Sequence, residues 1–417
     1  MDELYGKMDR KVLSISIARF IRVSGRSAIF IFLPLIFVLD YHMSLIETGA
    51  ITAGATAVMA TVQYFSGPLS DKHGRKFFME VIPFVTAIPY FFLFWAVGYT
   101  DNIYYMIIAW MSTMFLASLQ FPALQAAVAD LTNSGQRLAG YTQVRVFANM
   151  GAAVGPMLGA FTGIYGFKWI FLIASFTSII EGIMLHFAVG ETMERKNIDK
   201  TIKVKDKTFM KSRFILIFTA SSILFAFVTR QTGAAFTLYI FNLNNVNLLD
   251  LGVVYSLNGL LVVLLQIPIY RLMNRSMNNM QWRALGTAIY GISFMMLAFY
   301  SGLFFFIFVM GLITIGEDFS SPTTQTILMD VAPSGVRGSY QGKYAFLTAW
   351  GSVAGSFAGL GLLQNFYSDA YIFWIIIGVL GLLAAWWIIF MVKPYIEEKN
   401  SLALEEMSYA SSIGSPD

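Results

Sequence analysis

Ionisable side chains inside long apolar stretches are the groups in this sequence that could bind a solute. Arg22 and Arg26 lie one helical turn apart in one such stretch, and Arg230 lies in another. Guanidinium groups stay charged and can bind a carboxylate or a phosphate through two parallel hydrogen bonds. An ionisable group at the centre of a membrane helix costs about 2.5–3.5 kcal/mol to insert, so it usually faces a cavity or a partner. We therefore predict that these three arginines contact an anionic part of a solute or set the pKa of a coupling acid.

A structural role is the alternative for these cations. Arg19 and Arg22 could extend their charged heads to the lipid headgroups, and Arg230 could be neutralised by a nearby acid. We interpret Arg19 as structural, and both roles stay open for Arg22, Arg26 and Arg230.

Acids inside apolar stretches are the candidates for proton coupling: Glu181, Glu317 and Asp318. A carboxyl group removed from water holds its proton more tightly than an exposed one, which suits a proton carrier. Adjacent helical residues point about 100° apart, so one of Glu317 and Asp318 can face a cavity while the other packs. The alternative is a static ion pair with Lys343 or Arg230. Arg145 is expected to form a structural pair with Glu181 or with Glu80.

The stretches that carry these groups dominate the composition. Of 417 residues, 57% are hydrophobic and 12% are charged, whereas soluble domains carry about 25% charged residues. This composition excludes a disordered chain, a basic nucleic-acid-binding domain and a typical soluble enzyme. The chain has no cysteine and three dispersed histidines, so no metal site is expected. No phosphate-binding loop of the ATP-hydrolysing type occurs, and no cofactor is expected.

Apolar runs of about 20 residues, the length that crosses a bilayer, predict twelve membrane-spanning helices. Their limits are 14–39, 48–69, 77–98, 103–129, 138–164, 168–189, 213–241, 250–272, 282–301, 303–329, 338–364 and 369–392. Met1–Lys11 is polar and the run after it is too long for a cleavable signal peptide. Strands facing lipid are excluded because their backbone groups would lack partners. The fold class is therefore an all-α membrane protein.

The positive charges lie on one side of these spans. With the N-terminus in the cytoplasm, the inner segments hold 21 of the 28 Lys and Arg residues, the outer loops hold Lys168, and six lie within spans. This distribution predicts a multi-pass protein of the cell membrane with both termini in the cytoplasm. The predicted organisation is a first bundle at 1–190, a basic cytoplasmic linker at 191–212, a second bundle at 213–393 and a loose polar tail at 394–417.

The two halves of the chain repeat each other. Residues that recur after 200 positions include Pro122, Gln125, Asp130, Gly151, Gly155 and Gly159, which match Pro322, Gln325, Asp330, Gly351, Gly355 and Gly359. Nearer the start of each half the shift is larger, and Arg22-x-x-Gly25 matches Arg230-x-x-Gly233. The repeat predicts two pseudo-symmetric six-helix bundles, with Arg22 and Arg230 facing each other across a central cavity.

A glycine-bounded basic segment, GPLSDKHGRK at residues 67–76, lies between the second and third predicted spans. Glycine permits a tight turn, Asp71 can cap a helix N-terminus, and Arg75 can pair with Asp130. The segment resembles the signature loop of the major facilitator superfamily, Gly-x-Leu-x-Asp-Arg-x-Gly-Arg-Lys, with Lys72 in place of one arginine.

This resemblance implies a transporter in which two bundles open a central site to either side in turn. It also implies a latch that holds the outward-open state, formed by Gly67, Asp71, Gly74, Arg75 and Asp130. The alternative is a solvated basic turn that only fixes the topology.

A second motif consists of Gly151, Gly155, Pro156 and Gly159. It resembles the Gly-Pro-x-x-Gly-Gly motif of drug/proton antiporters in the superfamily, although Ala160 replaces the last glycine. Small residues four apart let helices approach closely, so ordinary packing is the alternative. Those antiporters also carry an arginine in the fourth span, and Tyr104–Ala129 contains no Lys or Arg.

These observations predict a secondary active transporter, not an enzyme, that moves a small organic solute and resembles proton-coupled drug-efflux proteins. The alternative is a carrier of organic anions or phosphate compounds, because organophosphate exchangers of the superfamily hold phosphate with paired arginines, as Arg22 and Arg230 could. A non-transporting sensor or scaffold would need an added domain or an eroded signature loop. The expected partners are the solute, the bilayer, and protons or another ion. We expect a monomer that binds no nucleic acid.

Overall fold

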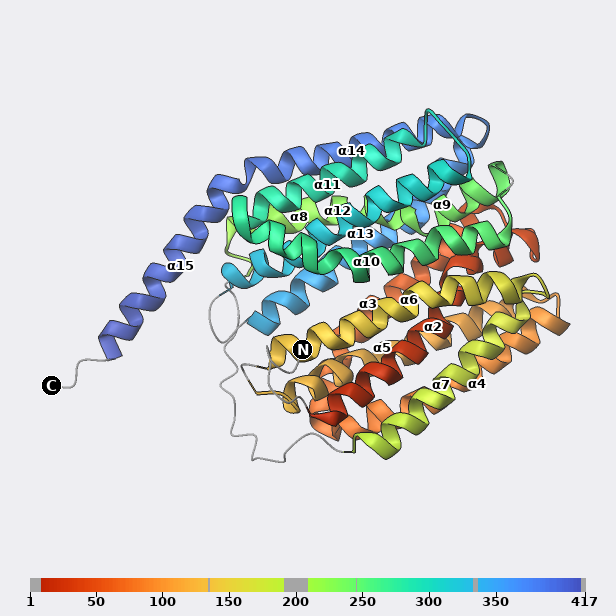
Figure 1. Ribbon diagram of the computed structural model, residues 1–417, viewed down its shortest axis with the longest axis horizontal. Coiled ribbons are helices and arrows are strands. Elements are labelled where there is room, and N and C mark those ends of the chain that lie inside the picture. Colours follow the sequence, from red (N-terminus) through yellow and green to blue (C-terminus); the bar gives the residue numbers. More distant parts are fainter. Residues whose placement is uncertain (1–8, 134–135, 191–208, 245, 333–336, 414–417) are drawn as a thin grey trace.

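The computed structural model describes residues 9–133, 136–190, 209–244, 246–332 and 337–413. Within these ranges the chain forms helices joined by short loops and contains no strand (Figure 1).

The helices fall into two groups along the chain. The first group is α2 (Arg10–Leu39), α3 (Leu45–His73), α4 (Arg75–Tyr99), α5 (Ile103–Asp130), α6 (Arg137–Gly163) and α7 (Lys168–Ala188). The second begins with α8 (Arg213–Thr229), the 3₁₀ turn η1 (Arg230–Thr232), α9 (Ala234–Leu238) and the π turn η2 (Tyr239–Leu243). It continues with α10 (Leu248–Ser276), α11 (Asn279–Met296), α12 (Leu303–Asp330), α13 (Arg337–Asn365), η3 (Tyr367–Asp369), α14 (Ala370–Phe390) and α15 (Val392–Ile413).

Polar caps and one glycine separate successive helices. The Ser44 side chain accepts from the backbone N–H of Glu47, and the Glu47 carboxylate accepts from the backbone N–H of Ser44, which completes a capping box at the start of α3. Asn278 and Gln281 do the same at α11. Gly74 has φ 91° between α3 and α4, a conformation that glycine adopts without steric cost. Gly67, in contrast, lies within α3.

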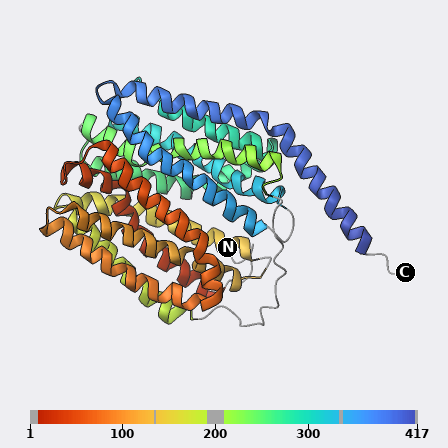
Figure 2. The same cartoon turned by 180° about the vertical axis from the view of Figure 1, so that it is seen from behind.

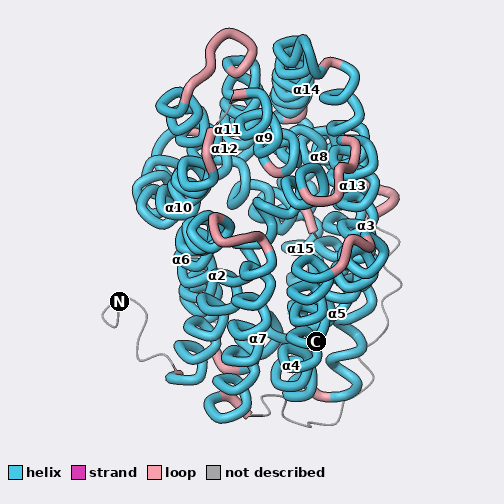
Figure 3. Tube along the Cα trace, turned by 90° about the vertical axis from the view of Figure 1, so that its right-hand side faces the viewer, coloured by secondary structure: helices cyan, strands magenta, loops and turns pink. Residues whose placement is uncertain are grey.

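The two groups use the same packing scheme. In the first, α2 packs on α6, α4 on α7, and α3 on α5; in the second, α8 packs on α13, α11 on α14, and α10 on α12. The groups meet where α3 lies against α13 and α6 against α10 (Figures 1 and 3). The prediction of an all-α fold with two related helical groups is confirmed.

Among the described residues, eleven helices are long and apolar enough to cross a membrane, so the predicted count of twelve is not confirmed. The predicted ninth span, 282–301, corresponds to α11, which has 18 residues and begins with the polar side chains of Asn279, Gln281 and Arg283. In this polar turn Arg283 is buried, and Asn279 and Gln281 are half-buried. The predicted seventh span is broken at Arg230, where α8 gives way to η1.

The tail beyond residue 394 was predicted to be loose, but α15 continues as a helix to Ile413 (Figure 2). Its first turns are tied to the second group: Lys399 Nζ lies 2.9 Å from Asp330 Oδ2, the Tyr395 hydroxyl donates to the same oxygen, and Ser212 donates to Glu398. Burial and the nearby Asp330 carboxylate raise the pKa of Tyr395, so its hydroxyl stays protonated and can donate. These contacts order a segment whose composition alone indicates no partner.

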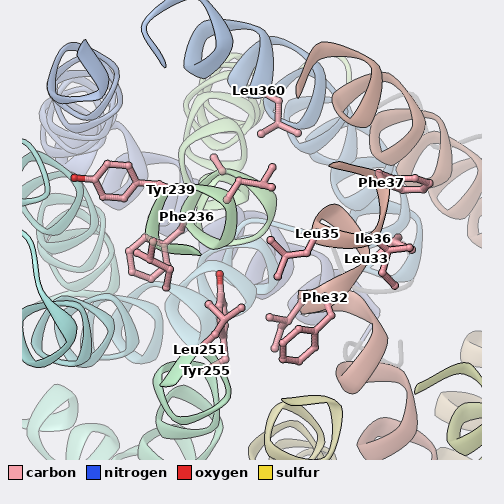
Figure 4. Packing of buried hydrophobic residues seen from close by; sticks show 14 of the residues in the cluster. Phe32, Leu33, Leu35, Ile36, Phe37, Phe236, Tyr239, Leu251, Tyr255 and Leu360 are labelled. Carbon is pink, nitrogen blue, oxygen red and sulfur yellow. The ribbon is translucent and has the colours of Figure 1, made fainter. Parts of the chain in front are cut away.

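The buried cores differ between the two ends of the molecule. We call the end where α7 finishes and α8 begins the linker end, and the opposite end, where α2 finishes and α3 begins, the far end. At the far end one apolar cluster joins both groups, including Phe32, Phe37, Phe236, Tyr239 and Leu360 (Figure 4). At the linker end the clusters around Ile15 and Phe214 each belong to a single group. The two groups are therefore sealed together at the far end.

Glycine stripes set the closest helix contacts. A Cβ added at Gly151, Gly155 or Gly159 of α6 would overlap atoms of α2, and one added at Gly351 or Gly355 of α13 would overlap the backbone of α8. Removing the side chain at these positions lets the backbones touch, as small residues do in membrane helix pairs.

Gly155→Val is expected to destabilise the protein by about 1–3 kcal/mol, because the added atoms would force α6 away from Ser24 and Ser27 of α2. The matched control is Gly342→Val in α13, where nothing lies within 4 Å of an added Cβ. Thermal unfolding of the purified variants in detergent measures the difference. Equal melting temperatures for the two variants would contradict the close α2–α6 packing.

Candidate functional site

A central cavity of about 280 Å³ lies between the two groups. It is lined by α2, α3 and α5 of the first group and by Arg230 and Ala234 of the second. Its walls are partly apolar, including Phe30 and Trp110, and Thr56 adds a hydroxyl. This cavity is shared by the two halves of the chain.

Arg230 enters this cavity at the break between α8 and α9. Its Nε donates to Ser356 Oγ at 2.7 Å, its Nη2 donates to Thr56 Oγ1 at 3.4 Å, and its guanidinium carbon lies 5.1 Å from the centre of the Phe30 ring. Ser356 belongs to α13 and Thr56 to α3, so Arg230 bridges the two groups. Among the described residues, no carboxylate lies within 4 Å of it.

Arg26 lines the same cavity from α2. Its Nη2 contacts the sulfur of Met59 at 3.8 Å, and within the described ranges it forms no ion pair. None of the described residues that line the cavity is Asp or Glu, so its lining holds two guanidinium groups and no acid; Glu181 acts on Arg26 from outside this lining. In surroundings of low polarity such a site attracts a negative charge.

Arg22 takes a different place from the one predicted. It is 2% exposed, it donates from Nη1 to Ser178 Oγ at 2.7 Å, and its Nε lies 3.4 Å from Glu181 Oε2. Its guanidinium also stacks on Tyr90, 5.2 Å from the ring centre. Arg22 is thus neutralised inside the first group, away from the residues that line the central cavity.

The glycine contacts explain this difference. Gly155 and Gly355 match at the 200-residue shift; Gly155 meets Ser24 and Ser27, whereas Gly355 meets Phe227 and Arg230. The structural counterpart of Arg230 is therefore Ser27, five residues beyond Arg22. The predicted pairing of Arg22 with Arg230 across the cavity is wrong, and Arg26 accompanies Arg230 there.

The predicted proton-coupling acids lie in two separate places. Glu181 is fully buried beside Arg22. Glu317 and Asp318 lie in α12, where the amide of Asn258 donates to Glu317 Oε2 at 3.4 Å. Asp318 is buried, and neither acid lines the central cavity.

Arg145 lies nearer to other acids than we expected. It acts electrostatically on Glu317 and Asp318, although it belongs to α6 of the other group. The expected partners of Arg145 are engaged elsewhere: Glu181 pairs with Arg22, and Glu80 lies 2.9 Å from His186 Nδ1. A charge interaction therefore connects the two groups, from α6 of the first to α12 of the second.

One pair in the predicted latch is present. Arg75 Nη1 lies 2.9 Å from Asp130 Oδ2, joining the start of α4 to the end of α5. The Asp71 side chain lies outside the part of the chain whose side chains the structure describes. Asp330, the repeat counterpart of Asp130, contacts α15 instead.

Sequence reasoning missed Arg283, which we counted among the loop cations. It is 2% exposed in α11, and it donates to Thr324 Oγ1 and, at 2.8 Å, to Ser222 Oγ. It lies beside a second cavity, of about 390 Å³, lined only by helices of the second group. Its only sequence signal was a position one residue inside the predicted ninth span.

Comparisons with known proteins agree with this architecture. The family model for the Major Facilitator Superfamily matches residues 15–356. The chain belongs to this superfamily. It is therefore a multi-pass integral membrane protein and a secondary transporter, not an enzyme. In the described ranges, no group of three or more metal-ligating side chains is placed to hold a metal ion.

Sequence relatives are identical to this chain at about a quarter of the aligned positions. The uncharacterized MFS-type transporter YttB of Bacillus subtilis is 25% identical over 61% of this chain, which spans 64% of that relative's length. A Na(+), Li(+), K(+)/H(+) antiporter of Planococcus maritimus is 24% identical, and the matched region covers 75% of this chain and 80% of the antiporter's length.

Solved structures show the same fold at low identity. The nucleoside transporter NupG superposes with a TM-score of 0.75 at 14% identity, covering 92% of this chain and 100% of that one. A POT family transporter in complex with 5-aminolevulinic acid superposes with a TM-score of 0.78 at 13% identity, covering 94% of this chain and 97% of that one.

Glu181→Gln is expected to destabilise the protein by about 3–5 kcal/mol, because it leaves the Arg22 charge buried without a partner. The double variant Arg22→Gln/Glu181→Gln removes both charges and is expected to regain part of this loss. Thermal unfolding in detergent compares the two variants. A single variant as stable as the unmodified protein would show that the pair does not neutralise Arg22.

Proposed function

We propose that this transporter carries a small organic anion and that Arg26 and Arg230 bind its acidic group in the central cavity. The observation that carries the proposal is the pair of guanidinium groups lining one cavity without a carboxylate partner among the described residues. Each guanidinium can present two parallel N–H groups to a carboxylate or a phosphate.

The rest of the cavity fits the remainder of such a solute. Phe30, Leu33 and Trp110 provide apolar and aromatic walls, and Thr52 and Thr56 provide hydroxyls. A volume of about 280 Å³ lies at the small end of ligand sites, so the solute is expected to be compact. An organic acid with an apolar body meets these conditions.

Efflux of lipophilic cations, which the glycine–proline motif favoured, has less support from this geometry. The two guanidinium groups, which have no ion-pair partner among the described residues, repel a cation, and α5 carries no basic side chain within the membrane. The glycines of the motif also recur in α13, where they pack against α8. Helix packing therefore accounts for the motif without a specific link to drug transport.

The acids of α12 are our candidates for proton coupling. Glu317 and Asp318 belong to the second group, and Arg145 acts on them from the first. Protonation of either carboxylate would weaken its attraction to Arg145 and so favour a conformation in which the two groups separate here. A proton would thereby shift the equilibrium between conformations, as coupling by alternating access requires. The related antiporter of Planococcus maritimus, which exchanges cations for H(+) by its name, supports proton coupling. Glu181, held by Arg22, is the weaker candidate.

We further propose that the linker end faces the cytoplasm, because it carries most of the Lys and Arg residues. The sealed far end would then face outward, and the structure would be open to the cytoplasm. In this orientation α11 crosses the cell membrane between α12 and α14 as the twelfth span. Arg75 and Asp130 are paired within the first group although the linker end would be open, so a latch formed with Gly67, Asp71 and Gly74 would not work by breaking this pair.

Arg26→Gln and Arg230→Gln are each expected to lower uptake by about tenfold or more, since a hydrogen bond to a charged group contributes about 1.5–3 kcal/mol. Benzoate, glucose 6-phosphate and tetraphenylphosphonium are first screened by thermal shift, and uptake of the best ligand is measured in proteoliposomes. Arg19→Gln is the matched control, because Arg19 lies on the same helix over the Phe121 ring, outside the cavity. Transport of tetraphenylphosphonium, or full anion uptake in both variants, would refute the proposal.

Glu317→Gln and Asp318→Asn test the coupling. We expect at least one of them to lose uptake driven by a pH gradient while keeping exchange of solute at equal pH, because a neutral side chain cannot release a proton. Asp369→Asn, an exposed acid at the start of α14, is the control. Normal pH-driven uptake in both variants would remove these acids from the coupling mechanism.

A further inference from the structure

A second cavity, which we call the Arg283 cavity, lies wholly within the second group. Its volume is about 390 Å³, and its walls come from α8, α11, α12 and α13. It shares no lining residue with the central cavity. Neither Arg26 nor Arg230 lines this cavity, although Thr229, the residue before Arg230, does.

Arg283 is the charged group of this cavity. Its guanidinium donates to Ser222 and Thr324, and its carbon lies 4.9 Å from the Phe218 ring and 5.5 Å from the Phe225 ring. Among the described residues, its buried Nε has no hydrogen-bond acceptor. Aromatic faces and hydroxyls stabilise a cation only in part, and within the described ranges no carboxylate lies within 4 Å of it.

The remaining walls offer donors and no acid. Gln325 and Gln341 expose side-chain amides here, Thr348 adds a hydroxyl, and Tyr344 and Phe225 form an aromatic side. None of the residues that line the cavity is Asp or Glu. A buried positive charge, amide donors and an aromatic wall together match an anion that carries an apolar body.

The first group provides an internal comparison. Its own buried arginine, Arg22, is as little exposed as Arg283 but lies beside Glu181. If burial of an arginine served packing alone, the same compensation would be expected in both groups. In the second group the compensating negative charge is missing from the described residues around the guanidinium, and an open space lies beside it instead.

We propose that the Arg283 cavity is a second binding site for a small organic anion, whose carboxylate or phosphate group binds Arg283 and whose body packs against Phe225 and Tyr344. The site goes beyond the proposed function, because it needs neither cavity-lining arginine of the central site. The same solute can occupy both sites, or a separate anion can bind here.

This chain contains no cysteine, so a single introduced cysteine can report on each cavity by its rate of labelling. Ala345→Cys places one thiol on the wall of the Arg283 cavity, and Ala234→Cys places one in the central cavity. The rate of labelling by the neutral reagent N-ethylmaleimide is measured with and without benzoate or inorganic phosphate. At ten times its Kd, a bound anion should slow labelling of Ala345→Cys about tenfold.

Arg283→Gln added to Ala345→Cys should raise the anion concentration that gives half-maximal protection by about tenfold or more, whereas Arg26→Gln/Arg230→Gln should leave the protection in place. Since Arg283→Gln could unfold the protein, benzamide, the neutral relative of benzoate, is tested on the Ala345→Cys protein with Arg283 intact. Benzamide should protect much less than benzoate. A merely structural role for Arg283 would not produce this dependence on the charge of the ligand.

The proposal is overturned if neither anion protects Ala345→Cys, if benzamide protects as well as benzoate, or if protection persists in Arg283→Gln. It is also overturned if Arg26→Gln/Arg230→Gln abolishes protection at Ala345→Cys, which would mean that one central site governs both thiols. Failure of the proposed function gives a different result: Ala234→Cys would be labelled equally with and without the anions, whatever happens at Ala345→Cys.

Discussion

Backbone contact between helices at the glycine stripes is the constraint on which the functional geometry depends. Gly355 of α13 meets Phe227 and the Cβ of Arg230, and its carbonyl oxygen accepts from Gln231 at 3.1 Å. A larger residue at Gly355 would move α13 away from the point where α8 breaks. The contact therefore fixes both the break and the direction from which Arg230 enters the central cavity. The matching stripe in α6 places α2, and with it Arg26, on the opposite wall.

The two groups share a backbone plan but differ in how they balance charge. In the first group Arg22 pairs with Glu181 and Arg75 with Asp130, whereas Arg26 forms no ion pair among the described residues. In the second group Arg230 and Arg283 have hydroxyl and aromatic neighbours instead. The duplication has thus kept helix packing, which depends on small residues, and changed the electrostatics, which depends on a few side chains. The unbalanced positive charge is the property that favours an anionic solute.

The sequence predicted the helices from local hydropathy, the duplication from matches 200 residues apart, and the Arg75–Asp130 pair from the charges at the ends of neighbouring spans. The residue of the first half that corresponds to Arg230 could not be predicted in the same way. A match of one arginine and one glycine can misalign the two halves by more than one helical turn. Here the alignment was wrong by five residues, because the structural counterpart of Arg230 is Ser27 and not Arg22. Hydropathy is averaged over all residues of a helix, so it does not reveal which face of the helix other helices bury. Arg283 was therefore counted among the loop cations, although it is buried in α11. The tail was predicted to be loose because the contacts that order α15, above all with Asp330, come from residues distant in sequence.

The apolar cluster at the far end has a consequence for leakage. Separating the two groups there would return the aromatic surfaces of Phe37, Phe236 and their neighbours to water, and each Å² of apolar surface so exposed costs about 25 cal/mol. A barrier made of packed apolar side chains needs no separate gate, and it excludes water and ions whenever the two groups are in contact at the far end. The protein can therefore stand idle in a membrane without dissipating the gradients that other proteins maintain.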